Sequence, residues 1–380
     1  MKKFLLSWLL LLPLALYAQN PVLNGSGYYR IQNSKTERYF VMVDDSAWLV
    51  TTPSTQDINT GAFKLMKPFE EYVATNPASI CYLTMHTNTQ YNISGQGLDL
   101  YARVQSYLEF RQRSNGTYTI GGTGTAAGIT LTKYLTDSSW RGDSAPVKTA
   151  EGNLDDYAYW WIRPINDKYY FGFQPTIKAS LDGDDSLYYA PFYASFSFII
   201  NSNVKAYYIS EVRDGYALIH DFVYTIPGVT PVIVECKSDV ATDNKVSLAV
   251  STVSATGNKL KGVYFCNDVE AYTEHRNVTA YNPNTMRVLG RAPDGRLAFV
   301  KSSSLEYIPA NTCYLPVPAG SPDIIYVVHE IPDGIEVAKA SETKTKQRGV
   351  YSLSGQRLGD TTEGLQKGIY VVDGRKVVIK

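Results

Sequence analysis

The recurrence of short apolar segments separated by turn-forming pairs constrains the fold more than any other feature of the sequence. From about residue 194, segments such as Lys205–Val212, Tyr216–Val223 and Lys245–Val253 alternate with Asp-Gly, Pro-Gly, Asp-Asn and Gly-Asn pairs. β-Branched and aromatic side chains favour pleated strands, and these pairs favour tight turns. The sequence therefore predicts an all-β chain, with a β-sandwich-like domain over residues 195–336.

The N-terminal part repeats one pattern, in which an aromatic strand is followed by a turn and a second strand. Three such pairs suggest an architecture with pseudo-threefold symmetry. They resemble the strand pairs of β-trefoil domains of the ricin-type lectins, although the Q-x-W pattern of the sugar-binding members is absent. The resemblance implies a trefoil-like domain over residues 22–194. The pairs are Gly27–Ile31 with Arg38–Met42, Tyr118–Ile120 with Ile129–Tyr134, and Tyr159–Pro164 with Tyr169–Phe173.

A small helical insertion is expected within this domain, near residues 76–107. Asn76 and Pro77 form a helix-start signal before the segment Ala78–His86. A second helix is predicted over about Gly97–Tyr107, where apolar side chains recur every three residues.

The N-terminus has the pattern of an export signal. Lys2 and Lys3 precede an apolar run over Leu5–Leu16, and Ala18 offers a small residue for cleavage. The sequence predicts a signal peptide over residues 1–18, cleaved after Ala18, and a secreted or cell-surface protein. The alternative is a buried N-terminal helix. No later stretch is apolar and long enough to span a membrane, so we expect no transmembrane span in the mature chain.

Composition limits the partners. Lysine plus arginine equals aspartate plus glutamate at 36 each, so nothing favours binding to nucleic acid or to an anionic membrane. Tyrosine is unusually abundant, with 30 residues. Tyrosine suits half-buried strands, and it also suits wet surfaces that bind sugars or peptides.

The four cysteines are too scattered for a zinc site. We expect at most one disulfide, among Cys236, Cys266 and Cys313, and Cys81 can be a small buried side chain.

No catalytic signature surrounds the four histidines, and no G-x-S-x-G motif is present. Cys266 with His275, and Cys313 with His329, are the pairs that could converge in space, but structural roles are expected for them. Gly121–Gly124 is expected to form a turn. The sequence thus predicts a protein without catalysis and without a cofactor.

Candidate binding residues lie in one aromatic segment and in one polar loop. Trp160, Trp161, Tyr169 and Tyr170 could contact a ligand or fill the core. Arg141 and Asp143 flank a glycine in a polar loop, an Arg-Gly-Asp triplet of the kind that presents a carboxylate to an integrin-bound metal ion.

Asp182, Asp184 and Asp185 could supply oxygen ligands for calcium. Their spacing differs from an EF-hand loop, and the alternative is a solvated acidic turn.

The C-terminal residues form a separate segment. Residues 337–348 have almost no apolar side chains and are expected to be a linker. Residues 349–380 then predict a small β tail, in which Gly368–Val372 and Lys376–Ile379 flank an Asp-Gly hairpin turn.

Two resemblances point to the same kind of location. Segments over about residues 195–335 resemble a module of secreted, surface-associated Bacteroidetes proteins: Lys205–Ile209, Ile226–Ile233, Asn258–Gly262, Leu297–Lys301 and Ile308–Leu315. The tail, with Val350–Arg357, Lys367–Tyr370 and Lys376–Lys380, is similar to the sorting segment read by the type IX (Por) secretion system. The resemblance implies secretion machinery as a partner of the tail.

These observations predict an exported, non-catalytic protein for extracellular binding or adhesion, which recognises glycans or host surface proteins. The alternative is a secreted hydrolase or protease inhibitor.

Overall fold

The computed structural model describes residues 23, 25–42, 63–66, 73–100, 107–126, 129–137, 144–146, 148–150, 152–251, 256–266, 278–331, 349–352, 357–372 and 375–379. The chain divides into two compact units, Met1–His329 and Glu330–Lys380. The predicted signal peptide, the Arg-Gly-Asp triplet and the linker lie outside the described residues. No helix in the described part of the chain is long and apolar enough to cross a membrane.

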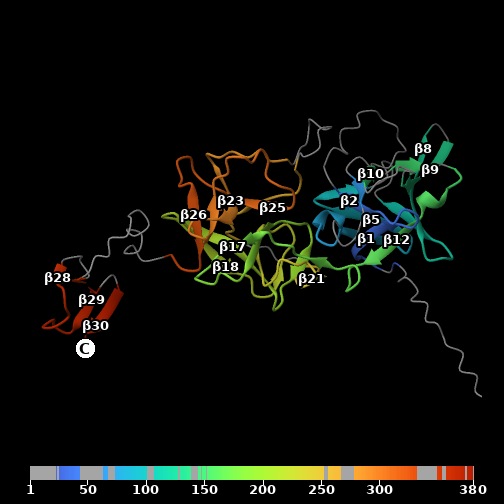
Figure 1. The fold of residues 1–380 in the computed structure, drawn as a ribbon. Coiled ribbons are helices and arrows are strands. Elements are labelled where there is room, and N and C mark those ends of the chain that lie inside the picture. The colour runs from blue at the N-terminus through green and yellow to red at the C-terminus, as the bar shows by residue number, and fades with distance from the viewer. Residues whose placement is uncertain are drawn as a thin grey trace, which may run out of the picture. The chain divides into compact units, whose positions relative to one another are not determined.

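The described elements are almost all strands, which confirms the all-β prediction. The first twelve strands form one sheet in the order β10-β3-β2-β1-β4-β5-β7-β8-β9-β11, with β12 paired to β1 and β8, and β6 paired to β5 (Figure 1). Their bounds are β1 Gly27–Asn33, β2 Tyr39–Met42, β3 Phe63–Met66, β4 Cys81–Thr87, β5 Gln90–Gly95, β6 Leu98–Leu100, β7 Leu108–Gln112, β8 Tyr118–Ala126, β9 Ile129–Thr136, β10 Ser144–Pro146, β11 Lys148–Ala150 and β12 Trp160–Pro164.

Buried side chains that alternate with more exposed ones along β1 and β12 contribute to the core on one face of this sheet. Ile31 pairs with Ile162 in the antiparallel register, and both side chains are buried. Trp160 is fully buried, and its ring lies edge-on to Phe40 at a centroid distance of 6.3 Å. Burial of such alternating positions removes apolar area from water, which stabilises the sheet.

The predicted helix over Ala78–His86 is wrong. Asn76 does cap a short 3-10 helix, η3 (Pro77–Ser79), but the chain then extends into β4. The reason is the period of the apolar residues: Cys81 and Leu83 alternate with Tyr82 and Thr84, and such alternation buries one face of a strand. The start of the second predicted helix is also a strand, β6. A second 3-10 helix, η4, spans Asp156–Ala158.

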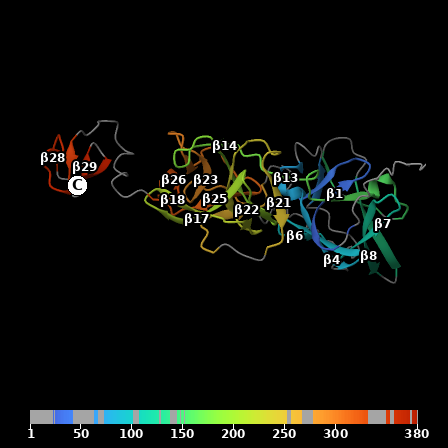
Figure 2. The same cartoon turned by 90° about the horizontal axis from the view of Figure 1, so that it is seen from below.

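The later strands form two further sheets. One has the order β13-β21-β16-β19, and the other is a ten-stranded sheet of order β14-β15-β20-β17-β18-β26-β24-β23-β25-β22 (Figures 1 and 2). Their bounds are β13 Phe171–Gly172, β14 Ile177–Lys178, β15 Tyr188–Phe192, β16 Ser197–Ile199, β17 Val204–Arg213, β18 Tyr216–Asp221, β19 Thr225–Ile226, β20 Val232–Cys236, β21 Lys245–Ala249, β22 Lys261–Val263, β23 Met286–Arg291, β24 Leu297–Val300, β25 Thr312–Pro316 and β26 Ile324–Val328.

These pairings differ from the sequence prediction in the position of the change of sheet and in the third predicted hairpin. Strands β13 to β15 belong to the later sheets, so the change of sheet falls between Pro164 and Phe171, ahead of the predicted boundary at residue 194. The predicted hairpin between Tyr159–Pro164 and Tyr169–Phe173 does not form, because β12 pairs with β1 while Phe171 pairs with Val246 of β21. In both features, pairing with strands distant in the sequence overrides the local pattern.

The predicted turn at Gly121–Gly124 is wrong, because these residues lie inside β8.

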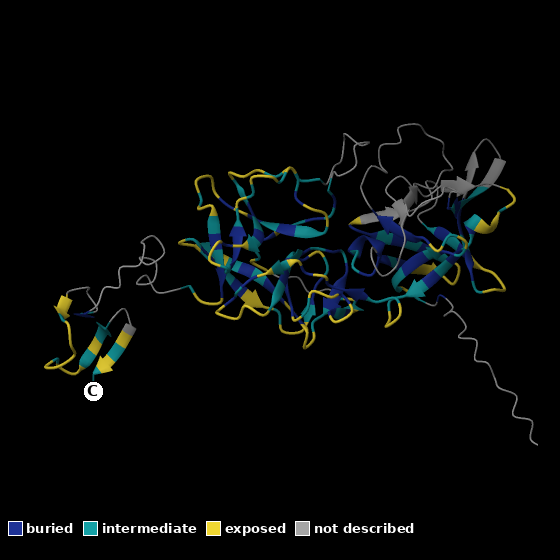
Figure 3. Ribbon diagram, viewed as in Figure 1, coloured by how far each residue is buried: buried dark blue, intermediate teal, exposed yellow. Residues whose placement is uncertain are grey.

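A phenylalanine cluster forms the core of the second group of sheets, whose strands carry many buried positions in Figure 3. The rings of Phe171, Phe173, Phe192, Phe196 and Phe198 pack at centroid distances from 4.9 to 6.0 Å, mostly edge to face. Such pairs add to the stabilisation from buried area. The opposite face of the ten-stranded sheet buries a second apolar cluster, which includes Ile209, Ile233 and Leu297.

The C-terminal unit contains a four-stranded sheet of order β28-β27-β29-β30. Its strands are β27 (Val350–Tyr351), β28 (Arg357–Gly359), β29 (Gly368–Val372) and β30 (Arg375–Ile379). β29 and β30 pair in antiparallel register, which confirms the predicted hairpin.

The ion pair between Arg38 and Asp137 should be a main support of the first sheet. The nearest oxygen and nitrogen are 2.8 Å apart, and the two side chains are 2% and 0% exposed. Asp137→Ala leaves a buried guanidinium without this carboxylate, so we expect the free energy of unfolding to fall by about 3–5 kcal/mol in urea denaturation. Asp156→Ala, which removes the exposed partner of Lys35, should cost less than about 1 kcal/mol. Equal losses would contradict this account.

Candidate functional site

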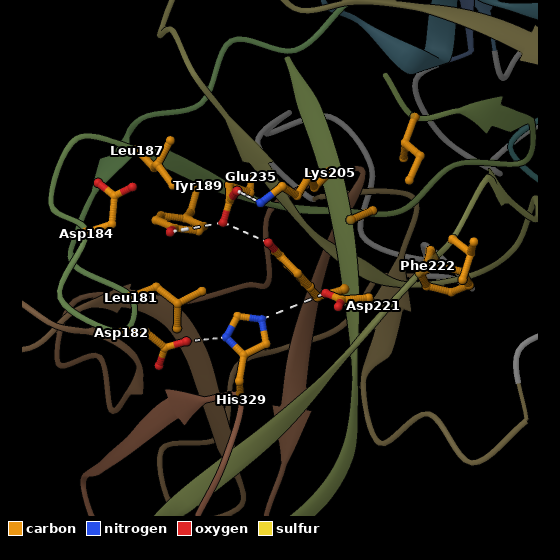
Figure 4. A pocket seen from close by; sticks show the side chains of 14 residues that line it. Leu181, Asp182, Asp184, Leu187, Tyr189, Lys205, Asp221, Phe222, Glu235 and His329 are labelled. Atoms are coloured by element: carbon orange, nitrogen blue, oxygen red, sulfur yellow. Dashed lines mark hydrogen bonds and ion pairs between the residues drawn. The ribbon is translucent and has the colours of Figure 1, made fainter. Parts of the chain in front are cut away.

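A cavity of about 490 Å³ lies at one face of the ten-stranded sheet (Figure 4). Strands β15, β17, β18 and β20 supply six of its fourteen lining residues, and the loop after β14 supplies four. His329, which follows β26, also lines it. Its polar lining residues are Asp182, Asp184, Tyr189, Lys205, Tyr207, Asp221, Glu235 and His329.

The register of the strands places the central polar residues on one face. Glu235 of β20 lies opposite Tyr189 on one neighbouring strand and opposite Lys205 on the other. Tyr207, two residues after Lys205, lies opposite Asp221 of β18. Residues two apart in a strand, and residues opposite one another in a pair, point to the same side of a sheet. Local alternation and strand pairing together therefore build the site.

Glu235 is the centre of the polar network. Its Oε2 accepts hydrogen bonds from the hydroxyl groups of Tyr207 at 2.8 Å and Tyr189 at 3.3 Å. Its Oε1 lies 3.0 Å from Nζ of Lys205. The Glu235 side chain is 6% exposed, whereas that of Lys205 is 62% exposed. A buried carboxylate requires such partners, because water no longer solvates it.

The two tyrosines remain hydrogen-bond donors across the ordinary pH range. Burial raises the pKa of the Tyr207 phenol far above its usual value, and the Glu235 carboxylate raises it further. The pKa of Tyr189 is raised by the same causes in the same order. Neither hydroxyl is therefore available as an oxyanion nucleophile near neutral pH.

His329 lies between two carboxylates at the other side of the cavity. Its Nδ1 contacts the Asp182 carboxylate, and its Nε2 is 3.8 Å from Oδ1 of Asp221. The imidazole ring also lies edge-on to the ring of Tyr207, with centroids 5.7 Å apart. These contacts connect the loop after β14 with the end of β18.

An apolar surface borders the polar face of the cavity. Leu181, Leu187, Ile200, Phe222 and Val223 contribute to the lining. Val223 is 91% exposed, although hydrogen bonds from Phe222 N to Ala206 O and from Ile200 N to Tyr224 O order the backbone around it. Exposed apolar side chains on an ordered segment are typical of a binding surface.

The predicted calcium ligands Asp182 and Asp184 have different protein partners in the structure. Asp182 contacts His329, and Asp184 Oδ1 accepts hydrogen bonds from the backbone and hydroxyl of Ser186. Among the described residues, no group of three or more His, Cys, Asp or Glu side chains could hold a metal ion. Asp185 is exposed. Calcium binding at this loop therefore remains a prediction, without support from the geometry.

The predicted aromatic contacts divide between the interior and the surface. Trp160 is fully buried, and its Nε1 donates to the carbonyl of Leu135 at 3.0 Å, so it fills the core. Trp161 points to the other face of β12, where the guanidinium carbon of Arg163 is 4.8 Å from its ring. The rings of Tyr169 and Tyr170 contact Arg163 and Lys245, at 5.0 and 4.3 Å. Trp161, Tyr169 and Tyr170 are half-buried and lie away from the cavity lining.

The candidate Cys–His pairs gain no support. No disulfide joins any two of the four cysteines, and Cys313 donates its Sγ hydrogen to the carbonyl of Val232. Burial raises the pKa of the Cys313 thiol to about 12, which disfavours the reactive thiolate. His329 contacts aspartates, as described above, and His275 lies outside the described residues.

Sequence reasoning missed Lys205, Tyr207, Tyr189 and Glu235 as a site. One signal was available: Glu235 is the single charged residue in the otherwise apolar strand Val232–Cys236. A carboxylate in such a strand requires buried partners, which identifies a polar site without naming its other members.

Comparisons with known proteins add no family. No family model matches the chain, and no curated protein matches it. Among solved structures, a mosquitocidal holotoxin aligns with 90% of this chain at 12% identity and a TM-score of 0.26. The chain spans 38% of the toxin's length.

The raised pKa values of Tyr189 and Tyr207 predict a loss of stability at alkaline pH. In the unfolded chain these phenols lose their protons near pH ~10, whereas in the folded protein they keep them. The unfolded chain then binds fewer protons, so the free energy of unfolding falls as pH rises, by up to about 1.4 kcal/mol per pH unit for each phenol. Urea denaturation from about pH 9 to about pH 11 should show a shallower fall for Tyr189→Phe/Tyr207→Phe than for the wild type. Tyr208→Phe, on the other face of β17, is the matched control. An unchanged slope in the double variant would contradict this assignment.

Proposed function

We propose that this protein is an exported, non-catalytic binding protein whose cavity over Glu235 binds an extracellular glycan. The support for this proposal is the combination of an apolar border with charged acceptors and donors in one open cavity. Sugars present hydroxyl groups and apolar C–H faces, so they require both kinds of surface in one place. Ligand sites commonly pair apolar walls with a few positioned polar groups.

The contacts of the polar residues favour binding over hydrolysis. Oε2 of Glu235 accepts hydrogen bonds from two tyrosine hydroxyl groups that stay protonated, and Oε1 is paired with an ammonium group. A general base needs a free lone pair directed at the substrate or its attacking water. The alternative functions, a secreted hydrolase or a protease inhibitor, have no comparable feature in their favour within the described residues.

The finer fold assignments belong to the same proposal. Twelve described strands, with β12 paired to β1, support a trefoil-like first domain, and the phenylalanine cluster supports a sandwich-like layering of the later sheets. The surface around Trp161 in the trefoil-like domain is a second place for extracellular contacts. A host surface protein is the other class of ligand that it could bind.

The proposal is tested by screening the mature protein on a panel of glycans and host surface proteins. We expect retention on glycans, reduced by Asp221→Asn at the cavity and unchanged by Glu211→Gln, which lies on β17 outside the cavity lining. Loss of one charge-assisted hydrogen bond should weaken binding by about tenfold. Hydrolysis of any generic substrate, or equal binding by both variants, would overturn it.

Export and surface retention are the second part of the proposal. Its support is the separate C-terminal unit with its own sheet, together with the sequence pattern at the N-terminus.

Deletion of residues 350–380 should abolish surface delivery in a type IX secreting host and leave the melting temperature of the remaining chain unchanged. Cell fractionation and thermal denaturation measure the two effects. A lowered melting temperature would show that the tail supports the fold, and unchanged delivery would remove its proposed role in sorting.

A further inference from the structure

The charges around the cavity narrow the class of glycan that it can bind. The carboxylates outnumber the cationic groups in the lining, and hydrogen bonds from Ser186 lower the pKa of Asp184, so it stays ionised. The resulting negative potential attracts cations and repels uronates or sulfated sugars. The carboxylates are those of Asp182, Asp184, Asp221 and Glu235, and the basic side chains are Lys205 and His329.

The protein itself shows which chemical group Glu235 accepts. An ammonium group, Nζ of Lys205, lies 3.0 Å from Oε1 of Glu235. The carboxylate cannot turn away, because the hydroxyl groups of Tyr207 and Tyr189 hold its other oxygen. The cavity thus contains a preorganised acceptor for a primary ammonium group.

Lys205 can leave this position at small cost when another cation takes its place beside Glu235. Lys205 is 62% exposed, so its ammonium group can move into water on a flexible stem. Glu235 is 6% exposed, and an unpaired buried carboxylate is unfavourable. A second ammonium group that enters the cavity can therefore replace Lys205 at Oε1.

From these contacts we infer that the ligand is a glycan with free, positively charged amino groups, one of which replaces the ammonium group of Lys205 on Glu235. The inference rests on the proposed function and specifies the ligand of the same cavity. The apolar border at Phe222 and Val223 contacts the C–H face of the sugar. Asp182, Asp221 and His329 are placed to contact its hydroxyl groups.

The experiment uses the full mature chain and two ligands that differ in one respect. Oligosaccharides of glucosamine, with free amino groups, are compared with oligosaccharides of N-acetylglucosamine of the same length by titration calorimetry. We expect the amino form to bind at least about tenfold more tightly, and its affinity to fall as salt is raised.

Two variants test the replacement step. Glu235→Gln should remove the preference for the amino form. Lys205→Gln should tighten binding of the amino form by about two- to fivefold, because no internal ammonium group competes. Glu211→Gln is the matched control and should change neither affinity. Thermal denaturation shows whether each variant is folded; if Glu235→Gln does not fold, Lys205→Gln still decides the question.

The outcomes separate the inference from the proposed function. Equal binding of both oligosaccharides, or weaker binding by Lys205→Gln, overturns the inference and leaves glycan binding in place. If neither oligosaccharide binds and the glycan panel is also negative, both proposals fail. Binding of polylysine without binding of the amino oligosaccharide would overturn the glycan assignment in favour of a cationic protein.

Discussion

The placement of Glu235 on β20 is the constraint on which the described site depends. A carboxylate with 6% exposure is tolerated only where donors surround it, and the register of β20 with its two neighbours supplies them. A one-residue shift of β15 would turn Tyr189 to the other face, and a one-residue shift of β17 would turn Lys205 and Tyr207 away, so either shift would remove partners of the carboxylate. The same requirement that makes the site possible therefore also specifies how these strands pair.

The two faces of this sheet serve different purposes. On one face, the phenylalanine cluster buries aromatic rings against the sheet of β13, β16, β19 and β21. On the other, the apolar cluster around Ile209 and Ile233 ends at the polar residues of the cavity. The rigid packing below the cavity keeps Tyr207 and Tyr189 in place, so that their hydroxyl groups meet Glu235 without the entropy loss of ordering mobile side chains.

Local pattern was sufficient for some predictions and misleading for others. The hairpin of β29 and β30 was predictable, because both strands and the turn lie in one continuous segment. The helix over Ala78–His86 was not, because a cap and a proline at Asn76 and Pro77 are also compatible with one 3-10 turn before a strand. Of the predicted site residues, Asp182 and Asp184 do line the cavity, but their contacts are with His329 and Ser186.

The sequence by itself determined the all-β class, several of the turns and the hairpin of the C-terminal segment, since these follow from side-chain preferences within a few neighbouring residues. Only the tertiary structure decided that Trp160 fills the core while Trp161 faces outward, and that Glu235 meets Tyr189, Lys205 and Tyr207. Those contacts join residues from strands far apart in the chain. Which strands pair, and in what register, depends on burial across the whole domain, and no local pattern contains that information.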